Sequence, residues 1–72
     1  MNKPILRKRF GERIRDLRKA KGFSQEAFAD KCGFSRSYMS RIETGGSNLS
    51  LDAIETLASA LEISVEKLFK GL

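Results

Sequence analysis

The sequence predicts an all-α domain, and three observations support this prediction. Apolar residues recur at three- and four-residue steps along most of the 72 residues, which is the period of an amphipathic helix. No segment alternates apolar and polar residues in the manner of a half-buried strand. Serine or proline precedes the periodic segments and glycine follows several of them, as at helix ends. We therefore expect one compact five-helix domain that spans residues 1–72.

Proline and glycine bound the first expected helix. It begins near Pro4–Ile5, because proline suits the first helical turn. It ends at Lys21-Gly22, where lysine complements the negative carboxyl end of the helix and glycine supplies a left-handed cap. Its apolar stripe consists of Phe10, Ile14 and Leu17.

Four serines mark the starts of the remaining helices, because a serine hydroxyl can cap free backbone N–H groups. Ser24 precedes a helix from 25 to 31 or 32, Ser35 one that runs to about 44, Ser50 one over 51–61, and Ser64 a last short helix. Gly33 breaks the second helix, and Gly45-Gly46 end the third. The apolar stripe expected on the fourth helix consists of Leu51, Ile54, Leu57, Ala58 and Leu61.

The composition argues against an enzyme, a metal site and a membrane protein. Histidine is absent, which removes the usual general base and the commonest metal ligand. The single cysteine, Cys32, allows neither an intrachain disulfide nor a zinc cluster, and its place on an inward stripe predicts a buried, inert thiol. No apolar run approaches the roughly 18–20 residues that span a bilayer, and the N-terminus lacks the apolar region of a signal peptide. We therefore expect a cytoplasmic, non-catalytic protein without a cofactor.

The net charge of the whole chain is +5, and its positive charge is concentrated in the first part. Residues 1–21 hold nine Lys or Arg against two acids, residues 22–46 are balanced, and residues 47–72 hold two Lys against four acids. This asymmetry favours a phosphate backbone as the partner of one face, although a solvated basic helix would look the same. A solvated run that adds non-specific attraction is expected at Lys3, Arg7, Lys8 and Arg9.

Residues 24–44 form the most informative segment. Two short helices joined by a three- or four-residue turn with a glycine are typical of a helix-turn-helix motif. Ala29 would allow the two helices to cross closely, and Gly33 would occupy the turn, where a positive φ is easiest for glycine.

The third expected helix has one side suited to reading DNA. At 100° per residue, Met39 and Ile42 fall on the inward side with Tyr38, and Glu43 lies at its edge. The outward side has no acid and consists of Arg36, Ser37, Ser40, Arg41 and Thr44. Arginine can bond guanine bidentately, and hydroxyls can reach bases or phosphates. Two interpretations of Tyr38 stay open: a contact at the DNA surface, or a ring wedged into the core.

The segment FSQEAFADKCGFSRSYMSRIETG, followed by LDAIETLASALEISVEKLF, resembles the Cro/phage-repressor (XRE-type) helix-turn-helix domain. The resemblance extends from about Phe10 to Phe69. Within that family, RSYMSRIE and SNLSLDAIETLASALEIS are similar to controller proteins of restriction–modification systems. The resemblance implies a regulator of transcription whose partners are an operator in double-stranded DNA, a second copy of the chain and, as a further candidate, RNA polymerase.

The resemblance also implies roles for individual residues. Gln25 matches a glutamine that anchors a DNA phosphate, while Ser47 and Asn48 lie in a loop that commonly contacts phosphate. Base edges would be touched by Arg36, Ser37 and Arg41, with Ser35 and Tyr38 at flanking positions. Arg18 and Glu43 match a partly buried ion pair. Relatives dimerise through their last helices, and we expect a dimer interface here at Ile63, Leu68, Phe69 and Leu72.

Two other functions compete with a DNA-binding regulator. An antitoxin-like module would have another protein as its main partner, and loss of DNA binding without loss of function would indicate it. An accessory domain of an enzyme is the second, although no nucleophile and base are paired in the sequence.

Overall fold

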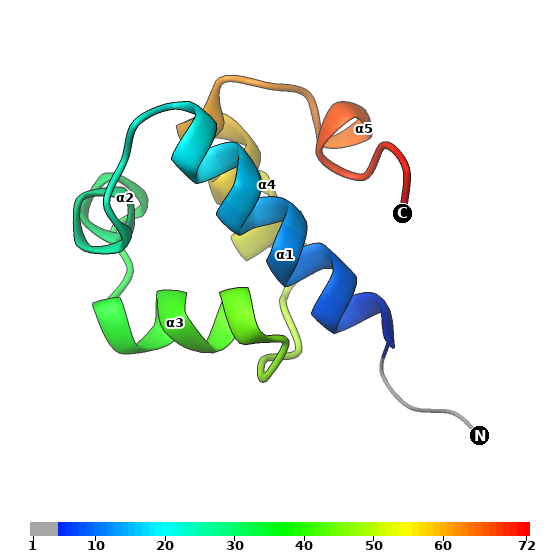
Figure 1. Ribbon diagram of the computed structural model, residues 1–72, viewed down its shortest axis with the longest axis horizontal. Helices are drawn as coiled ribbons and strands as arrows, with labels where there is room; N and C mark the ends of the chain where they lie inside the picture. The colour runs from blue at the N-terminus through cyan, green and yellow to red at the C-terminus, as the bar shows by residue number, and fades with distance from the viewer. Residues whose placement is uncertain (1–4) are drawn as a thin grey trace.

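The computed structural model describes residues 5–72, and these residues form five α-helices (Figure 1). The helices are α1 (Ile5–Ala20), α2 (Gln25–Cys32), α3 (Arg36–Thr44), α4 (Leu51–Leu61) and α5 (Val65–Leu68). No strand occurs within the described range, so the prediction of an all-α fold is confirmed. The expected helix start at Pro4 and the basic residue Lys3 lie outside the described residues.

All four predicted serine caps are present. The side chains of Ser24, Ser35, Ser50 and Ser64 each accept a hydrogen bond from the backbone N–H three residues later, at 3.0 or 3.1 Å. Gly33 and Gly45 close α2 and α3 in the left-handed conformation, with φ of 75° and 83°. The left-handed residue that ends α4 is Glu62, which carries no glycine signal in the sequence. The caps therefore fix short helices that would be marginal in isolation.

The helices pack around one core (Figure 1). α1 crosses the middle of the molecule with α4 behind it, α2 and α3 lie on one side, and α5 lies toward the other end. The largest fully buried side chains come from all five helices: Ile14, Phe28, Met39, Ile42, Leu57, Leu61 and Leu68. The core therefore holds α3 by its Met39–Ile42 side and leaves the opposite side of this helix free.

A glycine that the sequence reading passed over brings α1 and α3 into backbone contact. Gly11 is buried in α1, and a Cβ atom placed on it would lie 2.7 Å from the carbonyl oxygen of Glu43 and closer still to that of Ile42. Side-chain atoms do not fit at such distances, so the close approach of the two helices requires glycine here.

Two arginines of α1 fasten the C-terminal segment. Arg13 donates to the carbonyls of Lys67 and Leu68 at 2.8 and 3.2 Å, and Arg9 donates to the carbonyl of Gly71 at 2.9 Å. The carbonyl of Leu68 ends α5, and that of Lys67 also accepts from the backbone N–H of Lys70, so the two arginines tie the last turn and the residues after it to α1. The expectation that Arg9 belongs to a merely solvated run is wrong, because α1 passes beside the end of the chain.

Three expectations about burial need correction. Leu68 is 0% exposed, so it is a core residue and cannot form a dimer interface in the folded domain. Leu51 is 83% exposed, because the first residue of α4 projects beyond the core that the rest of its stripe enters. Cys32 is half-buried rather than buried. Burial nevertheless raises the pKa of its thiol to about 11, against the opposing effect of Lys31, so the thiol is protonated at neutral pH.

Candidate DNA interface

The outward side of α3 presents positive charge and hydroxyl groups to solvent. Arg36, Ser37, Arg41 and Thr44 are exposed and Ser40 is half-buried. Neither Arg36 nor Arg41 has an ion-pair partner among residues 5–72. The hydroxyl of Thr44 donates to the carbonyls of Ser40 and Arg41, which leaves only its lone pairs for another donor.

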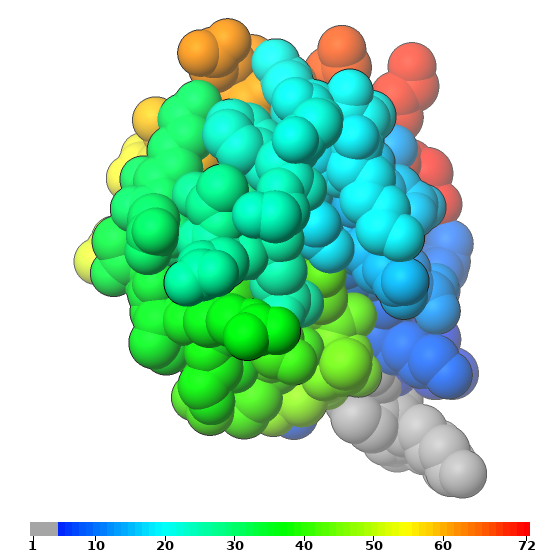
Figure 2. All heavy atoms as spheres, turned by 60° about the vertical axis from the view of Figure 1, so that its left-hand side comes forward, coloured from blue at the N-terminus to red at the C-terminus, as the bar shows by residue number. Residues whose placement is uncertain are grey.

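The start of α2 and the exposed side of α3 share a hollow of about 470 Å³. It is lined by Gln25, Arg36, Ser37, Ser40 and Arg41, all of them predicted DNA contacts. In Figure 2, α2 and α3 form one continuous face, with the basic helix α1 beside them. The structure therefore brings these five residues together. It places Ser47 and Asn48 elsewhere, in a second hollow beside Arg7.

A buried ion pair lies beneath this face, as the resemblance implied. Arg18 and Glu43 are each 7% exposed, and Arg18 donates from Nε and Nη2 to the two carboxylate oxygens of Glu43 at 2.7 and 3.0 Å. Arg18 also donates from Nη1 to the carbonyl of Phe23 at 2.9 Å. The pair fixes α3 against α1 through bidentate, charge-assisted hydrogen bonds.

Gln25 belongs to the same network. Its Nε2 donates to Oε1 of Glu43 at 3.2 Å, which fixes the amide at the mouth of the hollow. One N–H of the amide thus has a partner inside the protein, and the second remains for a ligand. No local sequence signal indicates this bond, because Gln25 and Glu43 are 18 residues apart.

An aromatic pair lies beside Arg41, one of the residues that line the hollow. The half-buried rings of Phe34 and Tyr38 meet edge to face, with their centroids 4.9 Å apart. The guanidinium carbon of Arg41 lies 5.7 Å from the Tyr38 ring centroid, and Nη1 of Arg41 donates to Oγ of Ser37 at 3.3 Å. Tyr38 packs against the core through its ring and contacts a predicted DNA-reading side chain at the same time.

The described part of the chain offers neither a metal site nor a membrane-spanning helix. No three side chains of His, Cys, Asp or Glu gather closely enough across residues 5–72 to hold a metal ion. Within the same range no helix has both the length and the apolar character to cross a membrane.

The family model of the helix-turn-helix domain matches residues 9–68 of this chain. The chain belongs to the helix-turn-helix family. Control protein C.MunI from a Mycoplasma species is 40% identical to this helix-turn-helix protein over 65 residues, which cover 89% of this chain and 88% of the relative. The resemblance to this family is therefore confirmed.

Solved structures agree with the assignment of this chain to the helix-turn-helix family. The restriction–modification controller protein C.AhdI from Aeromonas hydrophila superposes with a TM-score of 0.89 and 43% identity, over 96% of this chain and all of that one. The biofilm regulator SinR, solved in complex with DNA, superposes with a TM-score of 0.78 and 37% identity, over 85% of this chain and 98% of that one.

Proposed function

We propose that this protein regulates transcription by binding a specific double-stranded DNA operator, with α3 in the major groove. The observation that carries the proposal is the hollow shared by Gln25 and the exposed side of α3, where two arginines without acidic partners among residues 5–72 lie beside small hydroxyl residues. Arginine forks match the acceptor pair of guanine, and small neighbours let a helix lie deep in the groove.

Replacing either arginine should weaken binding to the operator more than binding to random DNA. Arg36→Ala or Arg41→Ala should cost about 1–3 kcal/mol of operator affinity if the contact is bidentate to guanine. Gel-shift titrations on operator and random duplexes at fixed salt measure both effects. Arg15→Ala removes the same charge from an exposed site on α1 and serves as the control. Full operator affinity in both α3 variants would contradict the assigned face.

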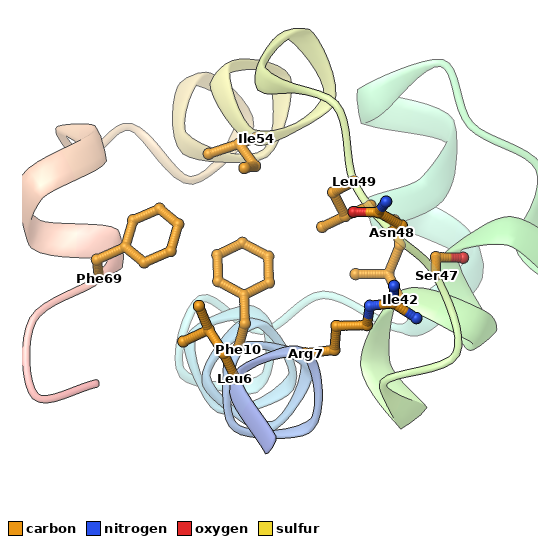
Figure 3. A pocket seen from close by; sticks show the side chains of 9 residues that line it. All are labelled: Leu6, Arg7, Phe10, Ile42, Ser47, Asn48, Leu49, Ile54 and Phe69. Carbon is orange, nitrogen blue, oxygen red and sulfur yellow. The ribbon is translucent and has the colours of Figure 1, made fainter. Parts of the chain in front are cut away.

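We further propose that two copies bind a pseudo-palindromic operator as a two-fold dimer. The site for the second copy is the hollow beside Arg7 described above, a largely apolar groove of about 350 Å³ on which α1, the loop from α3 to α4, α4 and the residue after α5 converge. Figure 3 shows Leu6, Phe10, Leu49, Ile54 and Phe69 around this space. Phe10 and Phe69 stack across it with ring centroids 5.0 Å apart.

Exposed apolar residues extend this groove. Leu6 is 57% exposed, and Leu51 lies one turn before Ile54 on the same side of α4. None of the arginines on α3 lines the groove, so a partner seated in it leaves the exposed side of α3 free. Ser47 and Asn48 do line it, so this dimer would not leave their predicted phosphate contacts fully open. Two-fold contacts are self-complementary, which suits one apolar patch meeting its copy. Of the residues expected at the interface, Phe69 lines the groove, whereas Ile63 and Leu72 pack partly on the core.

Leu51→Glu should convert the dimer to a monomer without unfolding it. Leu51 is the exposed first residue of α4, where a carboxylate interacts favourably with the helix dipole. Val65→Glu makes the same change at the first residue of α5, outside the groove, and should stay dimeric. Sedimentation at tens of micromolar, with titrations on a full operator and a half-site, measures the outcome. A monomeric wild type that binds both DNAs equally would rule out the dimer.

The names of the relatives support a proposal about the regulated genes. Because two solved structures similar to this chain are named restriction–modification controller proteins, we propose that the operator lies upstream of a methyltransferase and endonuclease pair. A footprint on the promoter of the protein's own gene tests this proposal. A toxin gene beside it, with function retained after DNA binding is lost, would instead indicate the antitoxin-like role.

A further inference from the structure

Arg41 is an exposed arginine that the protein itself holds in place. Its guanidinium lies against the ring of Tyr38 on one side and donates to the hydroxyl of Ser37 on another. Long exposed side chains normally sample several rotamers, and ordering one on binding costs about 0.5–1.5 kcal/mol. A side chain that is already held before it meets a ligand avoids much of that loss.

The ring that holds Arg41 is itself fixed from behind. Phe34, in the turn before α3, meets the edge of Tyr38 at a centroid separation of 4.9 Å and an interplanar angle of 78°. Both rings pack against the core cluster. The core therefore supports Phe34 and Tyr38, and Tyr38 in turn contacts the Arg41 guanidinium at the surface.

Most of the donors of Arg41 stay free in this arrangement. A guanidinium has five N–H groups, and the only hydrogen bond that the Arg41 side chain donates among residues 5–72 uses Nη1. The guanidinium carbon lies 5.7 Å from the Tyr38 ring centroid, and bidentate recognition of guanine uses N–H groups that make no hydrogen bond among residues 5–72. Contact with the Tyr38 ring and reading a base are therefore compatible.

We propose that Tyr38 is a positioning residue for DNA recognition, which holds the Arg41 guanidinium, with Ser37 and Phe34, in the orientation that reads a base. This inference rests on the proposed operator binding and adds a specificity role for Tyr38 and for Phe34, which lies outside the hollow. Tyr38 then acts through Arg41, and its hydroxyl is dispensable.

A double-mutant cycle on DNA tests the proposal. Tyr38→Leu should lower operator affinity relative to random DNA by about five- to thirtyfold, the range for a cation–π contact as water is excluded. Tyr38→Phe keeps the ring and should bind like the wild type. In an Arg41→Ala background, Tyr38→Leu should have no further effect. Thermal unfolding of each variant checks that the domain remains folded.

Equal losses from Tyr38→Leu in both backgrounds would overturn the proposal, because the ring would then contact DNA by itself. A loss in Tyr38→Phe as large as in Tyr38→Leu would also overturn it, since the hydroxyl would be the active group.

A second measurement needs no DNA. The ring of Tyr38 should shift the Arg41 side-chain proton resonances, and this shift should vanish in Tyr38→Leu and persist in Tyr38→Phe. Absence of the shift in the wild type would show that Arg41 is not held against the Tyr38 ring, and would overturn the proposal. Its presence in a protein whose Arg36→Ala and Arg41→Ala variants keep full affinity would place the failure in the proposed DNA-reading face instead.

Discussion

Glu43→Ala is expected to destabilise the domain by about 3–5 kcal/mol, because it leaves the Arg18 guanidinium buried without its counter-charge. The carboxylate accepts two hydrogen bonds from Arg18 and one from Gln25. Of these partners, Arg18 is itself buried and keeps only the carbonyl of Phe23. Small domains hold about 5–15 kcal/mol in total, so this loss is a large fraction of the stability.

Thermal denaturation measures the effect of Glu43→Ala. At about 4–8 °C per kcal/mol for a domain of this size, the melting temperature should fall by at least about 12 °C. Glu12→Ala removes an exposed carboxylate from α1 and should change it little. The double variant Arg18→Met with Glu43→Leu should recover much of the loss, since it removes both charges. Equal shifts for Glu43→Ala and Glu12→Ala would show that the pair contributes nothing.

Local signals in the sequence were sufficient for the helices. A serine cap acts on the N–H three residues later, and a glycine ends a helix through its own φ, so both can be read without knowledge of the fold. Gly33 and Ser35 therefore place the turn and the start of α3 directly. Glu62 shows the limit of this reasoning, because a non-glycine residue takes the left-handed position at the end of α4.

The sequence was sufficient to predict which residues of α3 are exposed at the candidate site. It was not sufficient to predict how their side chains are oriented or which neighbours they contact. The helical period separates Arg36 and Arg41 from Met39, and the structure agrees. The bond from Gln25 to Glu43 and the contact of Arg41 with Tyr38 depend on rotamers, which periodicity does not specify. Likewise, Leu68 shares its apolar character with interface residues, and only the packing of α5 against the core shows that it is buried.

Gly11→Ala is the second substitution with a large expected effect, and two opposing terms decide its sign. Alanine in a helix interior is favoured over glycine by about 1 kcal/mol. Against this gain, the new methyl group would overlap the carbonyl oxygens of Ile42 and Glu43, which are backbone atoms and cannot turn aside. Overpacking typically costs about 1–3 kcal/mol, and more where neighbours cannot yield. The clash should win, and the variant should be less stable than the wild type.

Relief of that clash requires α3 to move away from α1, which would disturb the proposed DNA-reading face as well as the fold. Gly11→Ala should therefore lose operator affinity even at temperatures where circular dichroism shows it folded. Gly46→Ala is the matched control, because the nearest atom to its new methyl group is at 3.6 Å, an ordinary contact. Unchanged melting temperature and operator affinity in Gly11→Ala would mean that the two helices can separate freely, and that α1 does not set the position of α3.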